Sequence, residues 1–468
     1  MIDLFLTAFV FALFAAGMRK PFIWVLAYVY IDVLAPQKIS WFLLEKLPIS
    51  LMAFGLAFLG WAYADAKNGS RFTFRQVLIA ALLLYCGATT MTADFPDDAL
   101  AKWDWVWKAL IFAVFLPLTL RTRLRIESTA LVMTLTAGAI IIPAGIKTLA
   151  SGGGYGSLHL LVNDNVGLYE GSILSTVAIA IIPLALWLAN HGTIFRPDWR
   201  VKLFAWGLCF ACALMPVGTE ARTGLVCLAI LIGLSLRDVK RRFLYVALIG
   251  AAGLLAVPFL PASFSQRMET IGDHKADQSA STRLAVWEWT IEFAKDHPFG
   301  GGFDAYRQNR LEIDLVDTQA SGNTTAIETT TVEDKARAYH SAYFEMLGEQ
   351  GYPGLALWLL LHGLGVWQME RIYRRHRRNP DPDKAWPDPD KAWIAPLASA
   401  LQRSQIVYLV GSGFVGIAFQ PFCYMIVALQ CGLWSWVRRH DSAVVLSAPV
   451  RRTHRDATAT PAGIGTVA

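Results

Sequence analysis

Thirteen apolar segments joined by polar loops constrain this chain more than any other feature of its sequence. A bilayer core takes roughly 20 apolar residues to cross as a helix, and a spanning backbone must satisfy its own hydrogen bonds in lipid. The alternating pattern of membrane strands is absent. We therefore predict an all-α, polytopic transmembrane helical bundle of about 12–13 spans. The segments are approximately 2–18, 22–35, 47–64, 75–92, 104–120, 127–146, 171–189, 203–218, 222–236, 243–260, 341–367, 396–418 and 421–437.

Several segments are shorter than a full span. The first pair, or the pair that meets at Thr219, could be half-helices, which would leave twelve crossings. Composition agrees with a membrane protein: 17% of the 468 residues are charged, against about 25% in soluble domains, and the mean hydropathy is +0.41. A net charge of +6 is too small to indicate a nucleic-acid partner. All six cysteines lie in apolar segments, which favours packing over a zinc or redox site.

Lysine and arginine residues are concentrated in every second loop between the apolar segments. They follow the first, third, fifth, seventh, ninth and eleventh segments, as in Arg121, Arg123 and Arg125 after the fifth. By the positive-inside rule these loops are cytoplasmic, and the remaining loops face the other side. The chain is then predicted to begin outside and end inside the membrane, unless the first segment does not cross, and its long loop faces outward.

The polar interruption before the eleventh segment divides the chain into parts. We expect an N-terminal bundle, a periplasmic catalytic loop, C-terminal transmembrane helices and a disordered cytoplasmic tail, at residues 1–260, 261–340, 341–437 and 438–468. The sequence PDPDKAW occurs twice in tandem within residues 380–393, which is typical of a linker.

One helix is expected inside the long loop. Ser281 or Thr282 can cap it, and it ends at Asp296 before a His-Pro pair and a glycine turn. An apolar stripe predicts an amphipathic helix that lies on the membrane or packs on the bundle; the stripe contains Leu284, Trp287, Ile291 and Ala294. Arg283 stands in the first turn against the helix dipole, so a bound anion would explain it. An ordinary surface arginine is the alternative. A variable polar stretch follows at 311–337.

Two further residues complete a candidate site. Arg222 lies where two apolar segments meet, and an arginine at membrane depth marks function by default; the alternative is a snorkelling residue or one paired with Glu220. His340 stands at the outer mouth of the eleventh segment, where a capping or packing role is the alternative. Two arginines can neutralise a diphosphate, and a neutral imidazole can accept a hydroxyl proton. This set suits glycosyl transfer from a lipid-linked sugar diphosphate.

A metal-dependent scheme would need clustered carboxylates on the outer side. The candidates there are Asp94, Asp97 and Asp98, in a short loop, while the Asp-x-Asp pairs of the PDPDKAW repeat lie on the opposite side. We therefore expect neither a metal nor a cofactor.

Three stretches resemble the O-antigen ligase and polymerase superfamily of bacterial inner membranes. They are TEARTGLVCLAI with Arg222, STRLAVWEWTIEFAKDHPFGGGF with Arg283, and YHSAYFEMLGEQGYPG with His340. Ser341 replaces the asparagine of the family's third motif. The N-terminal half, with RKPFIWVLAYVYIDVLAPQKISW, Trp107-Lys108 and GIKTLASGGG, is similar to the branch of exosortase-associated O-glycosylation ligases.

The resemblance implies a function. The donor would be a glycan on undecaprenyl diphosphate, Arg222 and Arg283 would bind the diphosphate, and His340 would activate the acceptor hydroxyl. The acceptor would be lipid A–core, another glycan or a protein. Possible supporting residues are Lys108, Trp287, Tyr343 and Glu349.

Three alternatives stay open at this stage. A repeat-unit polymerase needs the same donor chemistry as a ligase. A flippase or transporter is less favoured, since the two halves show no internal repeat and transporters rarely carry one long outer loop with a helix. The third alternative is a structural membrane component that only binds a glycan lipid.

Overall fold

Helices dominate the part of the chain that the structure describes. This computed structural model describes residues 2–67, 72–152, 167–237, 239–256, 278–321, 324–377 and 391–447. The first half contains α1 (Ile2–Arg19), α2 (Phe22–Leu34), α3 (Pro36–Ile39), η1 (Leu44–Lys46), α4 (Ile49–Ala64), α5 (Phe74–Met91), α6 (Pro96–Thr119), α7 (Arg123–Ser151), η2 (Gly167–Tyr169), α8 (Gly171–His191), α9 (Trp199–Gly218) and α10 (Arg222–Leu236). The second half contains α11 (Arg242–Ala256), α13 (Gln278–Asp296), η5 (Ala305–Gln308), β1 (Arg310–Ser321), β2 (Thr324–Lys335), α14 (Ala342–Arg377), α15 (Ile394–Gly411) and α16 (Pro421–Ser447).

Each of the thirteen predicted apolar segments coincides with a helix, and the all-α, polytopic class is confirmed. Five helices are long and apolar enough to cross a membrane by length and composition: α1, α5, α7, α8 and α9. Three shorter apolar helices, α2, α4 and α10, join them. α8 lies at the centre of the bundle, packed on α7, α9, α10 and α15, and it is the most buried of the five long apolar helices.

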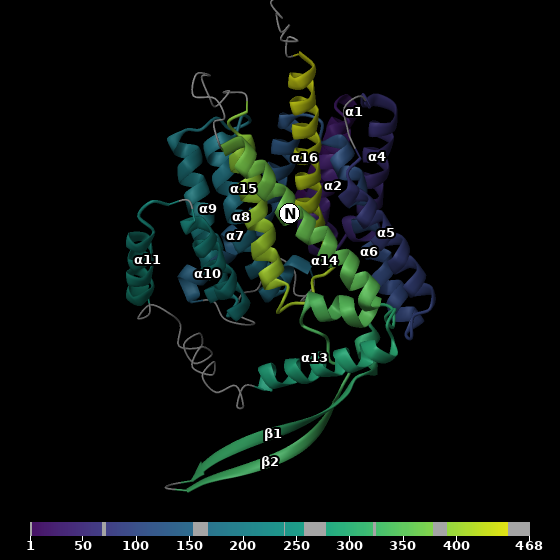
Figure 1. Ribbon diagram of the computed structural model, residues 1–468, viewed down its shortest axis with the longest axis vertical. Helices are drawn as coiled ribbons and strands as arrows, with labels where there is room; N and C mark the ends of the chain where they lie inside the picture. The colour runs from purple at the N-terminus through teal and green to yellow at the C-terminus, as the bar shows by residue number, and fades with distance from the viewer. Residues whose placement is uncertain are drawn as a thin grey trace, which may run out of the picture.

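The helices run between two ends of the bundle. At the outer end, as we call it, α8, α10, α14 and α16 begin, and this end points downward in Figure 1. The arginine-rich loops meet at the opposite, inner end. There Asp65 binds Arg125 at 2.5 Å, Arg439 donates to the Arg121 carbonyl at 2.8 Å, and Arg123 donates to the carbonyl of His191 at 2.7 Å. The loops that the sequence predicts to be cytoplasmic therefore gather at one end.

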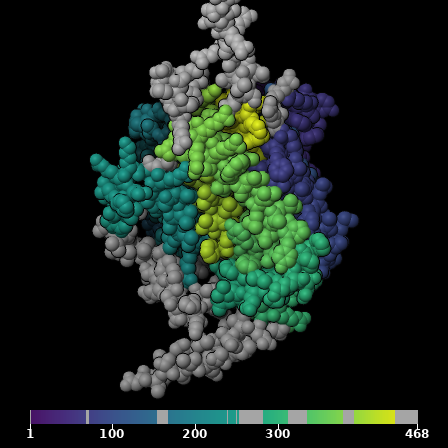
Figure 2. All heavy atoms as spheres, viewed as in Figure 1, coloured from purple at the N-terminus to yellow at the C-terminus, as the bar shows by residue number. Residues whose placement is uncertain are grey.

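The predicted loop helix forms α13, which begins four residues before Thr282 and packs on α14 at the outer end (Figures 1 and 2). Its buried face differs from the predicted stripe. Leu284 and Ile291 of the stripe are exposed, whereas Ala294 is buried as predicted, together with Val286 and Thr290, which the stripe did not include. Val286 is buried in a small core with Leu311 of β1 and Tyr339, and this packing leaves Leu284 and Ile291 as apolar residues on the outer surface.

The stretch predicted as variable and polar forms an antiparallel ribbon. β1 pairs with β2 from Arg310 opposite Lys335 to Ser321 opposite Thr324 (Figure 1). β2 is rich in threonine, which favours extended backbone, and this signal is easily missed in a polar sequence. At the chain's other end, α16 continues to Ser447, ten residues into the range predicted as a tail. Residues 261–277 of the predicted loop, 378–390 of the linker region and 448–468 lie outside the described residues.

Candidate functional site

His340 lies two residues before the start of α14, and the backbone on both sides of it is held in place. The Trp287 indole on α13 donates to the carbonyl of Tyr339 at 2.9 Å. On the other side the amide of Ala342 donates to the carbonyl of Ser412 at 2.8 Å. His340 itself has a φ of 48°, in the left-handed region that side chains of L-residues rarely adopt. Such strained positions often coincide with functional sites.

Arg283 and His340 lie close enough to interact electrostatically. Partial burial and the positive charges of Arg283 and Arg337 hold the pKa of His340 below its ordinary value. Part of the His340 side chain remains at the surface. The imidazole is therefore neutral at pH 7, the form that can accept a proton. Trp287 fixes this geometry, since its ring also stacks on Phe344 of α14 with centroids 4.9 Å apart.

The glycine turn after α13 docks into a break in α14. Gly351 interrupts that helix with φ 61° and ψ −167°, which leaves carbonyls of the preceding turn open. The amides of Gly301 and Gly302 donate to the carbonyls of Gly348 and Glu349, each at 3.0 Å. A Cβ atom on Gly351 would lie 2.3 Å from the Pro298 carbonyl oxygen. The turn therefore fixes α13 against α14, and with it the position of Arg283 relative to His340.

A buried ion cluster connects α14, next to this break, to α6 in the N-terminal half of the chain. The Lys102 ammonium on α6 lies 2.7 Å from Glu345 Oε1, 2.7 Å from Glu349 Oε1 and 3.8 Å from Asp304 Oδ1. Each side chain is at most one-fifth exposed, and that of Glu349 is fully buried. Glu345 also accepts from the amide of Ala418 at 3.0 Å. From the sequence, Glu349 was expected to support His340, but in the structure its carboxylate forms an ion pair with Lys102.

The outer cavity is a space of about 800 Å³ next to this cluster. Its walls come from both halves of the chain, and among them are Tyr28, Asp32, Lys102, Trp105, Tyr169 and Glu345. Much of the charge around it is compensated internally, because Lys108 pairs with Asp104 at 2.8 Å and Arg307 with Asp98 at 3.0 Å.

Two acceptor atoms in the cavity wall have no partner among the described residues. They are Asp32 Oδ2 and Gln37 Oε1, and both are buried. Aromatic walls with open hydrogen-bond acceptors suit a hydroxyl-rich, uncharged ligand such as a saccharide.

Arg222 is the first residue of α10, on the turn that follows α9 at the outer end. Glu220 in this turn has a φ of 51°. The turn and the start of α14 flank the same end of α15. Gly411 of α15 packs closely on α10, because a Cβ atom on it would lie 3.0 Å from Cys227 Sγ. The carbonyl of the next residue, Ser412, accepts a hydrogen bond from the amide of Ala342 at the start of α14. The structure thus brings Arg283, Trp287 and His340 together and places Arg222 at the same end of the bundle.

The other predicted supporting residues have contacts of their own. Lys108 faces the outer cavity. Tyr343 donates to the carbonyl of Leu409 at 3.0 Å and packs on Trp358, which is a structural role. The six cysteines are buried free thiols. Within the described ranges, no three His, Cys, Asp or Glu side chains gather as a metal-ion site.

Sequence reasoning did not single out Lys102, Asp304 or the outer cavity. One signal could have indicated the lysine. Glu345 and Glu349 stand four residues apart in an otherwise apolar stretch, and two carboxylates on one buried face require a cation from elsewhere. Nothing in the sequence identifies which lysine supplies it.

A comparison with protein-family models finds two matches, one in each half of the chain. Residues 207–359 match the model of the O-antigen ligase family. Arg222, Arg283 and His340 all lie in this O-antigen ligase region, which supports the predicted superfamily and a transferase of this kind. Residues 1–193 match a family of unknown function (DUF5935). The Lys102 cluster therefore joins the two matched regions. A comparison with curated proteins gives no match.

Proposed function

We propose that this protein is a membrane glycan ligase. It transfers an oligo- or polysaccharide from undecaprenyl diphosphate to an acceptor hydroxyl at the periplasmic face of the inner membrane, without a metal ion. The observation that carries the proposal is that the positive charge of Arg283 acts on His340 and lowers its pKa, inside the region that matches the O-antigen ligase family.

His340 acts as the general base in this scheme. The acceptor hydroxyl gives its proton to the imidazole while its oxygen attacks the anomeric carbon of the donor sugar. The bond between that carbon and the diphosphate oxygen breaks, and undecaprenyl diphosphate leaves with the electron pair. The imidazolium then returns its proton to solvent. A well-placed general base contributes about 10²–10⁴-fold to a rate.

Arg222 and Arg283 bind the diphosphate and stabilise the charge that develops on it. Arg283 contributes a second effect, because its charge keeps His340 unprotonated. The outer cavity holds the saccharide near the reacting centre, with Lys108 on its wall. The Glu345 side chain lines the outer cavity and also pairs with Lys102 in the ion cluster. Glu345 lies five residues after His340 in the sequence.

A donor-binding assay tests the arginines. Purified protein is titrated with a labelled undecaprenyl-diphosphate oligosaccharide, with and without EDTA. We expect Arg222→Gln and Arg283→Gln to weaken binding at least tenfold, and EDTA to have no effect. Lys295→Gln is the matched control, since Lys295 lies on α13 with Arg283 but pairs with Glu292 at the surface. Wild-type binding in both arginine variants, or loss of binding with EDTA, would contradict the proposal.

A repeat-unit polymerase is the alternative within the same chemistry, and its acceptor would be a second lipid-linked glycan. The lipid-linked products of a deletion strain separate the two. Complete chains left on the carrier indicate a ligase, and single repeat units indicate a polymerase. A flippase would instead move labelled lipid-glycan across sealed vesicles without forming a transfer product.

A further inference from the structure

The wall of the outer cavity contains an aspartate in an unusual place. Asp32 is the one charged residue in the sequence of the apolar helix α2, and it lies in the last turn of that helix. An ionisable residue in an apolar membrane helix is costly and marks a functional site by default. Asp32 lines the cavity, and its buried Oδ2 atom has no hydrogen-bond partner among the residues that the structure describes.

Gln37 supplies a second acceptor five residues later. Its Oε1 atom is also buried without a hydrogen-bond partner in the described part of the chain, and the residue lines the same cavity. Leaving a buried acceptor unpaired costs free energy, and such groups are rare in native structures. Two of them in one cavity wall are therefore best explained by a ligand that donates hydrogen bonds to both.

The turn between Asp32 and Gln37 is held in a strained conformation. Ala35 has a φ of 50° and a ψ of 56°, in the left-handed region that residues with a Cβ atom rarely adopt. Next to it, the hydroxyl of Tyr169 donates to the carbonyl of Leu34 at 2.5 Å. Ala35 and Tyr169 also line the cavity. Because strain of this kind persists only where the surrounding structure fixes it, the two acceptors are held in place by the fold.

The same cavity extends to the start of α14. Glu345 lines it, and the amide of Glu345 donates to the carbonyl of Ser341 at 2.8 Å. One helical turn therefore separates this part of the wall from the residue that follows His340. Asp32 and Gln37 belong to residues 1–193, which match a family of unknown function, whereas His340 belongs to the region that matches the O-antigen ligase family.

We propose that the N-terminal region recognises the glycan of the donor. Asp32 and Gln37 accept hydrogen bonds from hydroxyl or N-acetyl amide groups of a saccharide in the outer cavity, and they determine which sugar is transferred. A saccharide is the hydroxyl-rich ligand that the ligase function proposed above brings to this cavity, and the inference rests on that function. Both residues are specificity-determining residues and take no part in the bond-breaking step.

Binding of two probes to the purified full chain in detergent tests the proposal. One probe is labelled undecaprenyl-diphosphate oligosaccharide, and the other is undecaprenyl diphosphate without a sugar. We expect the wild type to bind the glycan-bearing probe more tightly. Asp32→Ala and Gln37→Leu should each weaken binding of this probe about tenfold and leave binding of the bare carrier unchanged. Gln37→Glu keeps an acceptor at the same position and should retain most of the affinity.

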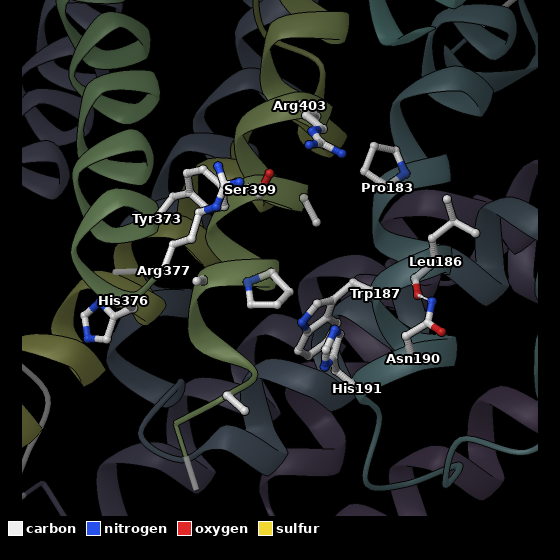
Figure 3. Close-up of a pocket in the computed structure, with 14 residues that line it drawn as sticks. Pro183, Leu186, Trp187, Asn190, His191, Tyr373, His376, Arg377, Ser399 and Arg403 are labelled. Atoms are coloured by element: carbon white, nitrogen blue, oxygen red, sulfur yellow. Dashed lines mark hydrogen bonds between the residues drawn. The ribbon is translucent and has the colours of Figure 1, made fainter. Parts of the chain in front are cut away.

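Two control variants match these changes. Asp97→Ala removes an exposed carboxylate of α6 that lies outside the cavity lining. Asn190→Leu repeats the change from an amide to leucine in a separate cavity of about 670 Å³, between α8, α14 and α15 at the inner end of the bundle (Figure 3). Both variants should bind the two probes as the wild type does.

Other results would overturn the proposal. Equal losses for both probes in Asp32→Ala and Gln37→Leu would show that these residues act on the fold or the diphosphate. Wild-type affinity for the glycan-bearing probe in both variants would place the donor sugar elsewhere. Should Asp32→Ala not fold, Gln37→Leu and Gln37→Glu test the same wall. Failure of the ligase function would look different, because tighter binding of the glycan-bearing probe, lost in these variants, would then occur without any transfer by the wild type.

Discussion

Removing the Lys102 ammonium should destabilise the protein more than removing the charge of an exposed residue at the outer end. In Lys102→Ala, Glu345 and Glu349 stay buried without the cation that lies 2.7 Å from each. Coulomb's law with an effective dielectric constant of about 20 gives roughly 6 kcal/mol for each of these pairs. Desolvation of the ions offsets several kcal/mol of this, and the measured cost of removing one partner from a buried pair is about 3–5 kcal/mol.

The effect can be measured as a fall in the unfolding midpoint of purified protein in detergent. We expect a decrease of roughly 5 °C or more, since 1 kcal/mol corresponds to about 2–4 °C in a domain of 150–250 residues and to less in a longer chain. Lys108→Ala is the matched control. Its ion pair with Asp104 is largely exposed and is expected to contribute about 0–1 kcal/mol.

A triple variant separates charge from packing. If uncompensated charge causes the loss, adding Glu345→Gln and Glu349→Gln to Lys102→Ala should recover part of the midpoint. A loss in Lys102→Ala no greater than that in Lys108→Ala would refute the argument that this cluster holds the two halves together. Failure of the glutamine substitutions to recover any stability would show that the lysine acts through its packing instead.

Three further predictions follow from the site. The lowered pKa of His340 predicts that the transfer rate is constant near pH 7 and falls only below about pH 6.5; Arg337→Gln removes a nearby positive charge and should move this fall to higher pH in a rate–pH profile. By the same linkage, the unfolded chain binds the His340 proton more readily, so this residue's contribution to stability is present above about pH 6.5 and is lost as pH decreases; the loss should be absent in His340→Gln when midpoints are compared at pH 7.5 and 5.5. Gly351→Ala places a methyl group against the Pro298 carbonyl in a left-handed conformation and should destabilise by about 1–3 kcal/mol, whereas Gly363→Ala on the same helix meets open space and should not.

The helices could be predicted because lipid makes apolar length a direct signal. All thirteen segments became helices, and their ends were most accurate where a polar cap or a break lies at the boundary, as at Arg222. The start of α6 was placed eight residues late, since Asp97 and Asp98 made its first turn look like a loop. Both residues instead lie in the first helical turn after Pro96, a position that suits acidic side chains.

The site was predictable only where a residue is unusual for its surroundings. Arg222, Arg283 and His340 are polar residues at the boundaries of apolar segments, and two of them prove to be neighbours. The partners of Glu345 and Glu349 were not predictable, because an ion pair between residues separated by more than 240 positions leaves no local pattern. The buried face of α13 was misassigned in part for a similar reason, since Val286 is buried against Leu311 and Tyr339, which the periodicity within α13 does not reveal.

The central claim is that His340 performs the proton transfer of a glycan ligase. The most direct measurement is single-turnover transfer from labelled undecaprenyl-diphosphate glycan to the acceptor, with purified protein and its His340→Ala variant at saturating donor. We predict a rate at least 10²-fold lower in the variant, with unchanged donor affinity and an unchanged unfolding midpoint at pH 7.5. Transfer at the wild-type rate by a folded His340→Ala protein would contradict it.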